Sequence, residues 1–301
     1  MHLINHTNNL FNLLNSDRLD DIQVGLELAQ SQSIDIQSFI EEMEFLYAWM
    51  YPWKDISQIN LAEKIQTIYT VPYLNLYERG ITYVPAQIKY LRKLTQLSWP
   101  KNQITYLPEE IGTLSLLQQI ILCENPLSEL PDSFSKLTQL KRLQLNDTLL
   151  QTFPADIGNL TQLEYLNLSG NQMEHFPIEL CTLKQLNELR IDRNQLTTLP
   201  VEFQNLTQLK TLHLTYNQFS EFPESLCNLP SLESLDLRAN QLHTFSDHIS
   251  KLASLRDLNL ADNQLSILTS GSGYVYGTQE FKPFIKPTFR ATRRNRQTDY
   301  Y

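Results

Sequence analysis

The chain has little of several residue types on which enzymes depend. Only 8 of its 301 residues are glycine and only 3 are cysteine. Phosphate-binding loops need clustered glycines, and the sequence contains none of the usual nucleotide-binding, metalloprotease, hydrolase or dithiol motifs. Its 6 histidines are scattered, without the spacing of metal ligands. These absences indicate a protein that is not an enzyme and that uses no cofactor and no metal.

The few cysteines also bear on the compartment. Cys181 and Cys227 hold the same place in two units of the repeat described below. Parallel strands two spacings apart lie roughly 10 Å from each other, which is too far for a disulfide. The first residues lack the basic start and sustained apolar core of a secretory signal. We therefore expect reduced thiols and a cytoplasmic location.

Long apolar runs and positive charge are lacking too. No stretch approaches the roughly 18 apolar residues of a membrane-spanning helix, so no membrane span is expected. The chain carries 33 acidic against 24 basic residues, a formal net charge of −9. A surface this acidic repels phosphate backbones, and nucleic acid is therefore not expected as a partner.

What the chain has instead is a repeat of 23 residues. One unit, from Leu163 to Leu183, reads LEYLNLSGNQMEHFPIELCTL. The same arrangement of apolar residues, Asn and Pro recurs nine times without insertion or deletion. The nine units open at Val71, Leu94, Leu117, Leu140, Leu163, Leu186, Leu209, Leu232 and Leu255. A fixed period of this length is typical of a solenoid, in which each unit contacts only its neighbours.

The pattern LxxLxLxxNxLxxLPxxIxxL resembles the leucine-rich repeat, in the 23-residue form of intracellular Ras-group proteins and of many bacterial proteins. The resemblance implies an α/β solenoid, a horseshoe of nine repeats over residues 71–268 with a parallel sheet on its concave side. It also implies a protein-binding surface, because such repeats serve mainly as interaction scaffolds. Regulation of a small GTPase or of another signalling enzyme is a second function that the resemblance suggests.

Each position of the unit has a physical role. In the LxxLxL stretch, alternation predicts that Leu166 and Leu168 point inward while Tyr165 and Asn167 point outward. The ninth residue is Asn in seven units, and we expect its side chain to bond backbone groups where the chain leaves the strand. A Pro recurs on the return side in seven units and fixes an extended or turn conformation, which predicts short turns of helical or 3-10 type there.

Residues 1–70 do not fit the repeat, and we interpret them as a small helical cap over the first unit. Apolar residues at helical spacing predict helices near residues 10–14, 19–29 and 36–50, with Pro52 ending the third, and a fourth over 56–68. Under the alternative interpretation the segment is a separate partner-binding domain. Its contact residues would then be Trp49, Tyr51 and Trp53.

The C-terminal residues also leave the repeat. Residues 269–287 contain apolar side chains that can fold over the ninth unit as a second cap. Residues 288–301 lack apolar periodicity and are interpreted as a disordered basic tail with Arg293, Arg294 and Arg296. A solvated terminus is favoured over docking on an acidic partner or a membrane surface.

The outward positions of the concave sheet are the candidate binding site. Tyr and Arg carry much of the energy of protein interfaces, and here they lie among carboxylates that would give register and specificity. The candidate partner-binding residues are Tyr165, Arg190, Asp192, Arg193, His213, Tyr216, Asp236 and Arg238. In the opposing interpretation these side chains only solvate the surface as weak ion pairs. Tyr73, Tyr77 and Ile121 form a smaller, more apolar alternative.

The sequence thus predicts a monomeric, non-catalytic scaffold that binds a protein partner on the concave face. Two other functions stay open, namely regulation of a small GTPase or other signalling enzyme, and a role as an exported bacterial effector or surface adhesin. The last rests on the Asn- and Gln-rich, disulfide-free composition of the repeats.

Overall fold

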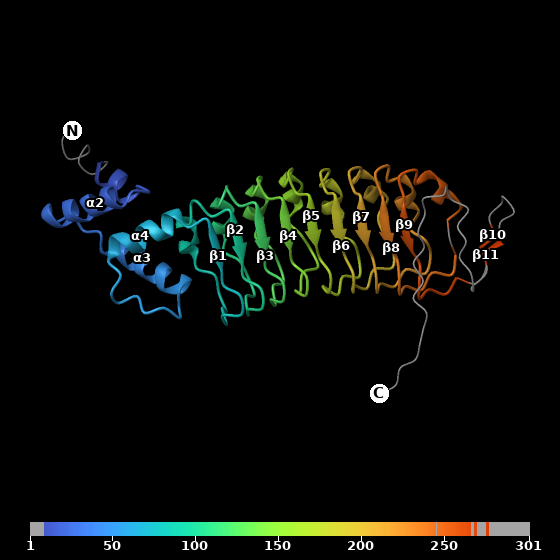
Figure 1. Ribbon diagram of the computed structural model, residues 1–301, viewed down its shortest axis with the longest axis horizontal. Coiled ribbons are helices and arrows are strands. Elements are labelled where there is room, and N and C mark those ends of the chain that lie inside the picture. The colour runs from blue at the N-terminus through green and yellow to red at the C-terminus, as the bar shows by residue number, and fades with distance from the viewer. Residues whose placement is uncertain (1–8, 245, 266–267, 270–274, 277–301) are drawn as a thin grey trace, which may run out of the picture.

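Each repeat places one short strand beside the strand of the unit before it. The computed structural model describes residues 9–244, 246–265, 268–269 and 275–276. Nine parallel strands form a single sheet whose order follows the chain (Figure 1). The strands are β1 (Tyr73–Asn75), β2 (Gln96–Ser98), β3 (Gln119–Ile121), β4 (Arg142–Gln144), β5 (Tyr165–Asn167), β6 (Glu188–Arg190), β7 (Thr211–His213), β8 (Ser234–Asp236) and β9 (Asp257–Asn259). The predicted solenoid and its parallel sheet are confirmed.

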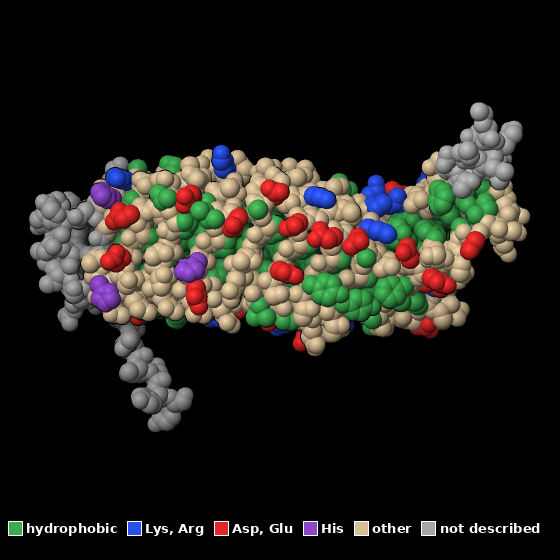
Figure 2. Space-filling model, turned by 180° about the vertical axis from the view of Figure 1, so that it is seen from behind, with side chains coloured by type: hydrophobic (Ala, Val, Ile, Leu, Met, Phe, Trp, Pro, Cys, Tyr) green, Lys and Arg blue, Asp and Glu red, His purple; other side chains and the backbone are tan. Residues whose placement is uncertain are grey.

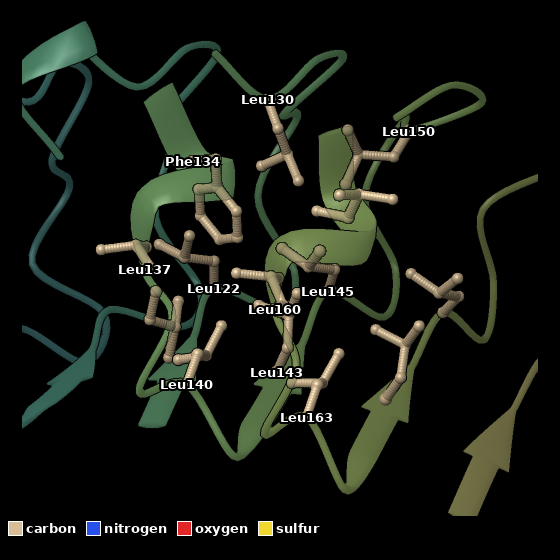
Figure 3. Close-up of a cluster of buried hydrophobic side chains, with 14 of the residues drawn as sticks. Leu122, Leu130, Phe134, Leu137, Leu140, Leu143, Leu145, Leu150, Leu160 and Leu163 are labelled. Atoms are coloured by element: carbon tan, nitrogen blue, oxygen red, sulfur yellow. The ribbon is translucent and has the colours of Figure 1, made fainter. Parts of the chain in front are cut away.

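The strands pair in a register of one full unit. Leu166 lies opposite Leu189, and Tyr165 lies opposite Glu188. Because the register never slips, the central Leu or Ile of every strand falls in one continuous row. Figure 3 shows how Leu143, Leu163 and their neighbours pack with residues of the return segment, including Phe134. The leucines at intervals of one unit therefore form a single core that extends along the solenoid.

The predicted asparagine ladder closes the core where the chain leaves each strand. The Nδ2 group of Asn194 donates to the carbonyls of Leu168 (3.0 Å) and Ile191 (3.2 Å). Its Oδ1 atom accepts from the backbone N–H of Met173 at 2.9 Å. One buried side chain thus satisfies backbone groups of two adjacent units that would otherwise lack partners.

Unit four departs from the ladder. Thr148 replaces the Asn there, and its hydroxyl donates to Oδ1 of Asn171 and lies 3.0 Å from the carbonyl oxygen of Leu145. In unit one the position is Arg79, whose backbone N–H donates to Oδ1 of Asn102 at 3.0 Å. The neighbouring Asn therefore serves the backbone of a unit that lacks its own.

The convex side consists of short 3-10 helices, as the prolines predict. In the first seven of these helices a proline stands directly before the first residue, and in the eighth Ser246 takes its place. The helices are η1 (Ala86–Tyr90), η2 (Glu109–Thr113), η3 (Asp132–Lys136), η4 (Ala155–Asn159), η5 (Ile178–Thr182), η6 (Val201–Asn205), η7 (Glu224–Asn228) and η8 (Asp247–Lys251). Proline fits this position because its fixed φ suits the turn and its missing N–H is not needed there.

One residue per unit adopts a left-handed backbone conformation between the strand and the ladder Asn. The residues of this left-handed row are Glu78, Lys101, Glu124, Asp147, Gly170, Arg193, Tyr216, Ala239 and Asp262, with φ between 52 and 73°. Only one of them is glycine, so the conformation is held by its surroundings. The N–H of Arg193, for example, donates to the carbonyl of Thr215 in the next unit at 2.8 Å.

The N-terminal segment is helical, as predicted. Residues 9–14 are helical, and they precede α2 (Leu19–Ser31), α3 (Gln37–Met50) and α4 (Leu61–Thr70). The expected start of the fourth helix at residue 56 is wrong. The helix begins after Asn60, whose Oδ1 atom accepts from the N–H of Glu63 at 2.9 Å and so caps the first turn.

Helices α3 and α4 cover the first repeat. Their apolar faces, including Met43, Leu46, Ile65 and Ile68, are buried in the same core as the solenoid. The first helical residues and α2 form a small separate core around Leu10 and its neighbours. The segment is therefore joined to the repeats by shared apolar burial at α3 and α4.

Trp99 marks the junction between cap and repeats. It fills an inward leucine place in unit two, is fully buried, and meets the ring of Trp49 edge to face with 5.4 Å between ring centroids. Trp49 is only 8% exposed and donates its Nε1–H to the carbonyl of Tyr83 at 3.2 Å. The interpretation of Trp49 as a contact residue of a free binding domain is therefore wrong. Of its two companions, Trp53 is 49% exposed and Tyr51 is half-buried.

At the other end, β9 is the last strand of the parallel sheet. Its central Leu258 is half-buried, whereas the equivalent residues of β1–β8 are buried. A two-residue antiparallel pair, β10 (Leu268–Thr269) and β11 (Val275–Tyr276), follows. The rest of the expected cap at 269–287 and the basic tail at 288–301 lie outside the described residues. Among the helices that are described, none has the length and apolar character needed to cross a membrane.

Candidate partner-binding face

The outward side chains of the sheet form rows that cross the strands. Asn167, Arg190, His213, Asp236 and Asn259 stand side by side along one row from β5 to β9. A second row, two residues further along each unit, contains Asp192 and Arg238. The predicted partner-binding residues thus occupy adjacent places over β5–β8, and the structure brings all eight into one region.

Two of the predicted residues are engaged with neighbours on the surface. The guanidinium of Arg142 lies over the ring of Tyr165, 4.0 Å from its centroid. Nε of Arg190 donates to a carboxylate oxygen of Glu188 at 2.8 Å, two residues earlier on the same strand. Both contacts are partly exposed, so each contributes under about 1 kcal/mol to stability. Their main effect is to fix the orientation of Tyr165 and Arg190.

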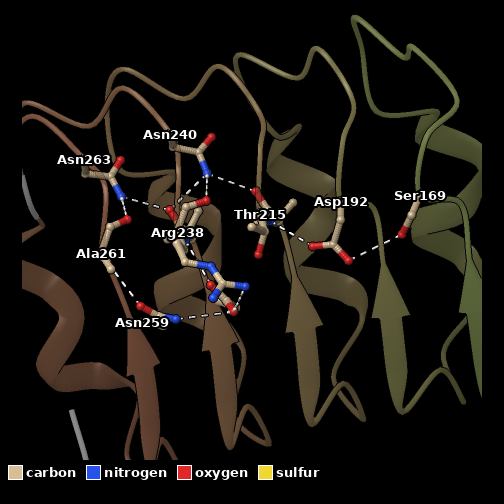
Figure 4. A network of polar contacts seen from close by, with 11 residues as sticks. Ser169, Asp192, Thr215, Arg238, Asn240, Asn259, Ala261 and Asn263 are labelled. Atoms are coloured by element: carbon tan, nitrogen blue, oxygen red, sulfur yellow. Dashed lines mark hydrogen bonds and ion pairs between the residues drawn. The ribbon is translucent and has the colours of Figure 1, made fainter. Parts of the chain in front are cut away.

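Asp192 and Asp236 each accept a hydrogen bond from a backbone N–H group. Asp192 Oδ1 accepts from the N–H of Thr215 at 2.9 Å, and its Oδ2 accepts from the hydroxyl of Ser169 at 3.4 Å (Figure 4). Asp236 Oδ1 accepts from the N–H of Arg238 at 3.0 Å, and the guanidinium of Arg238 lies 3.7 Å from Oδ2. These carboxylates therefore support the turns at the strand ends, a role that sequence reasoning did not assign to them.

Arg193, His213 and Tyr216 are different. Among the described residues, their side chains make no hydrogen bond or ion pair. Tyr216 is 58% exposed, and Arg193 is also exposed. Both belong to the left-handed row, where they occupy equivalent places in adjacent units. An unpaired guanidinium and an unpaired phenol therefore stand in adjacent units, just beyond the C-terminal ends of β6 and β7.

The apolar alternative lies toward the N-terminal end. Tyr73 and Tyr77 are 47% and 44% exposed, whereas Ile121 is half-buried. The ammonium of Lys101 lies 5.5 Å from the ring centroid of Tyr77. The opposite view of the molecule shows a further hydrophobic stripe near the N-terminal repeats, and acidic side chains spread along the solenoid (Figure 2).

No metal centre forms in the described part of the chain. No group of three His, Cys, Asp or Glu residues could hold a metal ion there. Burial raises the pKa of the Cys181 thiol to about 12, with nearby Glu202 and Glu179 adding to the shift. This thiol is therefore protonated at neutral pH and is a poor nucleophile.

Comparison with known proteins agrees with this architecture. The family model described as the leucine-rich repeat region matches residues 96–195 and 152–267, which together cover more than half of the chain. The chain belongs to the leucine-rich repeat family. No curated relative matches it.

Several solved leucine-rich repeat structures are similar. The ectodomain of the plant membrane receptor kinase GASSHO1/SCHENGEN3 from Arabidopsis thaliana, solved in complex with CASPARIAN STRIP INTEGRITY FACTOR 2, matches with a TM-score of 0.53 and 31% identity over 61% of this chain and 23% of that one. A TDR receptor matches with a TM-score of 0.50 and 27% identity, over 67% of this chain and 44% of that one.

Internalin C2 from Listeria monocytogenes matches over 76% of this chain and 92% of its own, with a TM-score of 0.58. At 24% identity this likeness shows a shared fold. The chain thus spans nearly the whole length of the internalin but only 23% of the GASSHO1/SCHENGEN3 ectodomain.

Proposed function

We propose that this leucine-rich repeat protein is a non-catalytic scaffold that binds a protein partner on its concave face, over β5–β8. The observation that carries the proposal is the exposed pair Arg193 and Tyr216, whose side chains have no partner among the described residues. The charged groups around them are already engaged with their own neighbours. A partner could therefore gain contacts with this pair without first breaking existing ones.

The backbone favours such a role. Arg193 and Tyr216 project from left-handed positions whose N–H groups are bonded to the next unit, Tyr216 to the carbonyl of Arg238 at 3.1 Å. Their main chains are thus fixed before binding, which lowers the entropy lost on association. Nine strands about 4.8 Å apart give a face roughly 40 Å long. A standard interface of about 800 Å² per partner fits on it.

The comparisons support a binding role in general terms. The plant receptor ectodomain that shares 31% identity was solved in complex with another factor. That relationship covers 23% of the receptor and supports a binding surface on this chain.

The test is a double substitution, Arg193→Ala with Tyr216→Ala. The wild-type protein is used as bait in a native lysate, the captured protein is identified by mass spectrometry and purified, and its affinity is measured by calorimetry. Interface Tyr and Arg residues often contribute about 2 kcal/mol each, so we expect the double variant to bind roughly 100-fold or more weakly.

A matched control carries Lys184→Ala with Tyr106→Ala. Both residues are exposed and lie outside the strands of the sheet. This control should keep wild-type affinity, and both variants should keep the circular dichroism of the wild type. An unchanged affinity in the Arg193 and Tyr216 variant would refute the proposed site.

A further inference from the structure

A small hollow lies at the C-terminal end of the concave face. It has a volume of about 180 Å³ and is lined by residues of β7, β8 and β9. The lining residues are His213, Ser234, Leu235, Asp236, Asp257, Leu258 and Asn259. It adjoins the proposed partner-binding face, with which it shares His213 and Asp236.

The hollow arises from side-chain length. The first residues of the strands form one row across the sheet. In this row Tyr165 and Glu188 on β5 and β6 are followed by Thr211, Ser234 and Asp257 on β7, β8 and β9. The surface therefore drops where long side chains give way to short ones. No special backbone feature is needed, because β8 and β9 keep the regular register.

The walls of the hollow retain unused hydrogen-bonding capacity. Among the described residues, the carboxylate of Asp257, the hydroxyl of Ser234 and the ring of His213 make no side-chain hydrogen bond or ion pair. Asp236 Oδ2 has only long contacts, 3.5 Å to Nδ2 of Asn259 and 3.7 Å to the guanidinium of Arg238. Elsewhere on this face, Asp192 and Glu188 already accept shorter hydrogen bonds.

Size and charge together select the ligand. Pockets for cofactors and drug-sized molecules occupy about 300–1,000 Å³, so this hollow takes little more than one side chain. Two carboxylates and a hydroxyl on its walls offer acceptors from two adjacent strands, β8 and β9. A planar guanidinium presents five N–H donors in a fixed fork, which matches such a set better than the compact ammonium of lysine.

We propose that the hollow formed by Ser234, Asp236 and Asp257 is the receiving site for one arginine side chain of the protein partner. The inference rests on the proposed function and gives the partner a required feature, an exposed arginine placed to reach β8 and β9. The guanidinium would bond Asp257 and Ser234 and would give Oδ2 of Asp236 the short hydrogen bond that it lacks.

The experiment uses the full chain and a fluorescein-labelled synthetic peptide with two arginines in a glycine background, followed by fluorescence anisotropy at low ionic strength. The same peptide with citrulline in place of arginine keeps the shape and removes the charge. We expect the arginine peptide to bind measurably and the citrulline peptide to bind at least tenfold more weakly. Equal binding of the two peptides would overturn the proposal.

Two variants locate the site. Ser234→Tyr fills the hollow without changing the charge, and a tyrosine already occupies the equivalent place in β1 and β5. Asp257→Asn removes one carboxylate charge. A lost charge-assisted hydrogen bond corresponds to roughly tenfold in affinity. We expect about that weakening from Asp257→Asn and a larger one from Ser234→Tyr.

Each variant has a matched control. Gln119→Tyr places the same ring in the same row on β3, and Asp156→Asn makes the same charge change on the convex side. Both controls should bind the arginine peptide as the wild type does. If the controls weaken binding as much as the hollow variants, the peptide is held by the overall negative charge and the proposal fails.

Two further arms separate this inference from its alternatives. Replacing Arg290, Arg293, Arg294 and Arg296 with Gln should leave peptide binding unchanged. A marked gain in affinity would assign the hollow to the chain's own C-terminal segment and overturn the assignment to a partner. If Arg193→Ala with Tyr216→Ala weakens capture of the purified partner but Ser234→Tyr does not, the proposed function stands and the arginine site is refuted.

Discussion

The N-terminal junction and the central repeats belong to one hydrophobic core but are held together in different ways. In the central repeats the same leucine contacts and Asn bonds recur from unit to unit. At the junction each contact occurs once: Trp49 meets Trp99, the hydroxyl of Tyr90 donates to Glu42 at 2.6 Å, and Arg92 lies over the ring of Tyr69. The comparison indicates that the junction depends on individual residues, whereas the repeats depend on a pattern.

The largest expected effect is that of Trp99→Ala at the junction. Removing a fully buried tryptophan should lower the free energy of unfolding by about 3–5 kcal/mol, because a cavity remains beside Trp49. Hydrogen exchange should become faster mainly in α3 and β2. The central counterpart, Leu168→Ala, should instead speed exchange around β5 and leave α3 protected. Faster exchange in the same segments for both variants would contradict the distinction between the two regions.

The next effect tests the pattern of the central repeats. Asn194→Leu leaves the carbonyls of Leu168 and Ile191 and the N–H of Met173 buried without this partner. We expect a loss of about 3 kcal/mol in the free energy of unfolding, measured by urea denaturation. The control is Gln195→Leu, the exposed neighbour, which should change stability by less than about 0.5 kcal/mol. Equal effects of the two substitutions would mean that the ladder is not what closes the core.

The residues that sequence reasoning placed correctly are those whose role is set within one unit. Leu166 and Leu168 are buried, Asn194 bonds the backbone, and Pro177 stands before a 3-10 helix because period and residue type alone determine these roles. The burial of Trp49 was missed because it depends on contact with Trp99, fifty residues away in the chain. Such contacts leave no periodic signal.

The left-handed row was also missed, although a weak signal exists. Of its nine residues, Gly170 and the two aspartates are of types that favour a positive φ. The others include Arg193 and Tyr216, which rarely adopt it. The absence of β-branched residues from the row is the signal that could have revealed it. For the candidate site, the sequence identified which residues face outward. It could not show which of them are paired, since Arg190 and Glu188 meet through rotamers that the pattern does not determine.

The junction and the repeats should also differ in their response to alkaline pH. Burial raises the pKa of Tyr69 to about 12, with Arg92 opposing the shift and Asp17 adding to it. Burial and a hydrogen bond to Glu42 also raise the pKa of Tyr90. In the unfolded chain tyrosine ionises near pH 10. Between about pH 10 and 12 the unfolded state therefore loses protons that the folded state keeps, and stability falls as pH rises.

This pH dependence is tested by urea denaturation at several pH values from about 9 to 12. The wild type should lose stability steadily above about pH 10, and Tyr69→Phe with Tyr90→Phe should lose less over the same range. Tyr106→Phe, at an exposed position, serves as the control and should follow the wild type. If the free energy of unfolding of the double variant falls with pH as steeply as that of the wild type, the junction tyrosines do not cause the loss of stability at alkaline pH.

The smallest expected effect concerns the surface of the central repeats. Arg190 and Glu188 are 41% and 32% exposed in their side chains, and an ion pair at such a site contributes under about 1 kcal/mol. Arg190→Ala with Glu188→Gln should therefore leave the denaturation midpoint nearly unchanged, and the small difference should shrink further in high salt. A loss as large as that of Asn194→Leu would mean that the concave face contributes to the stability of the fold. The absence of such a loss would leave the face free to vary with the partner while the leucines and asparagines beneath it hold the solenoid.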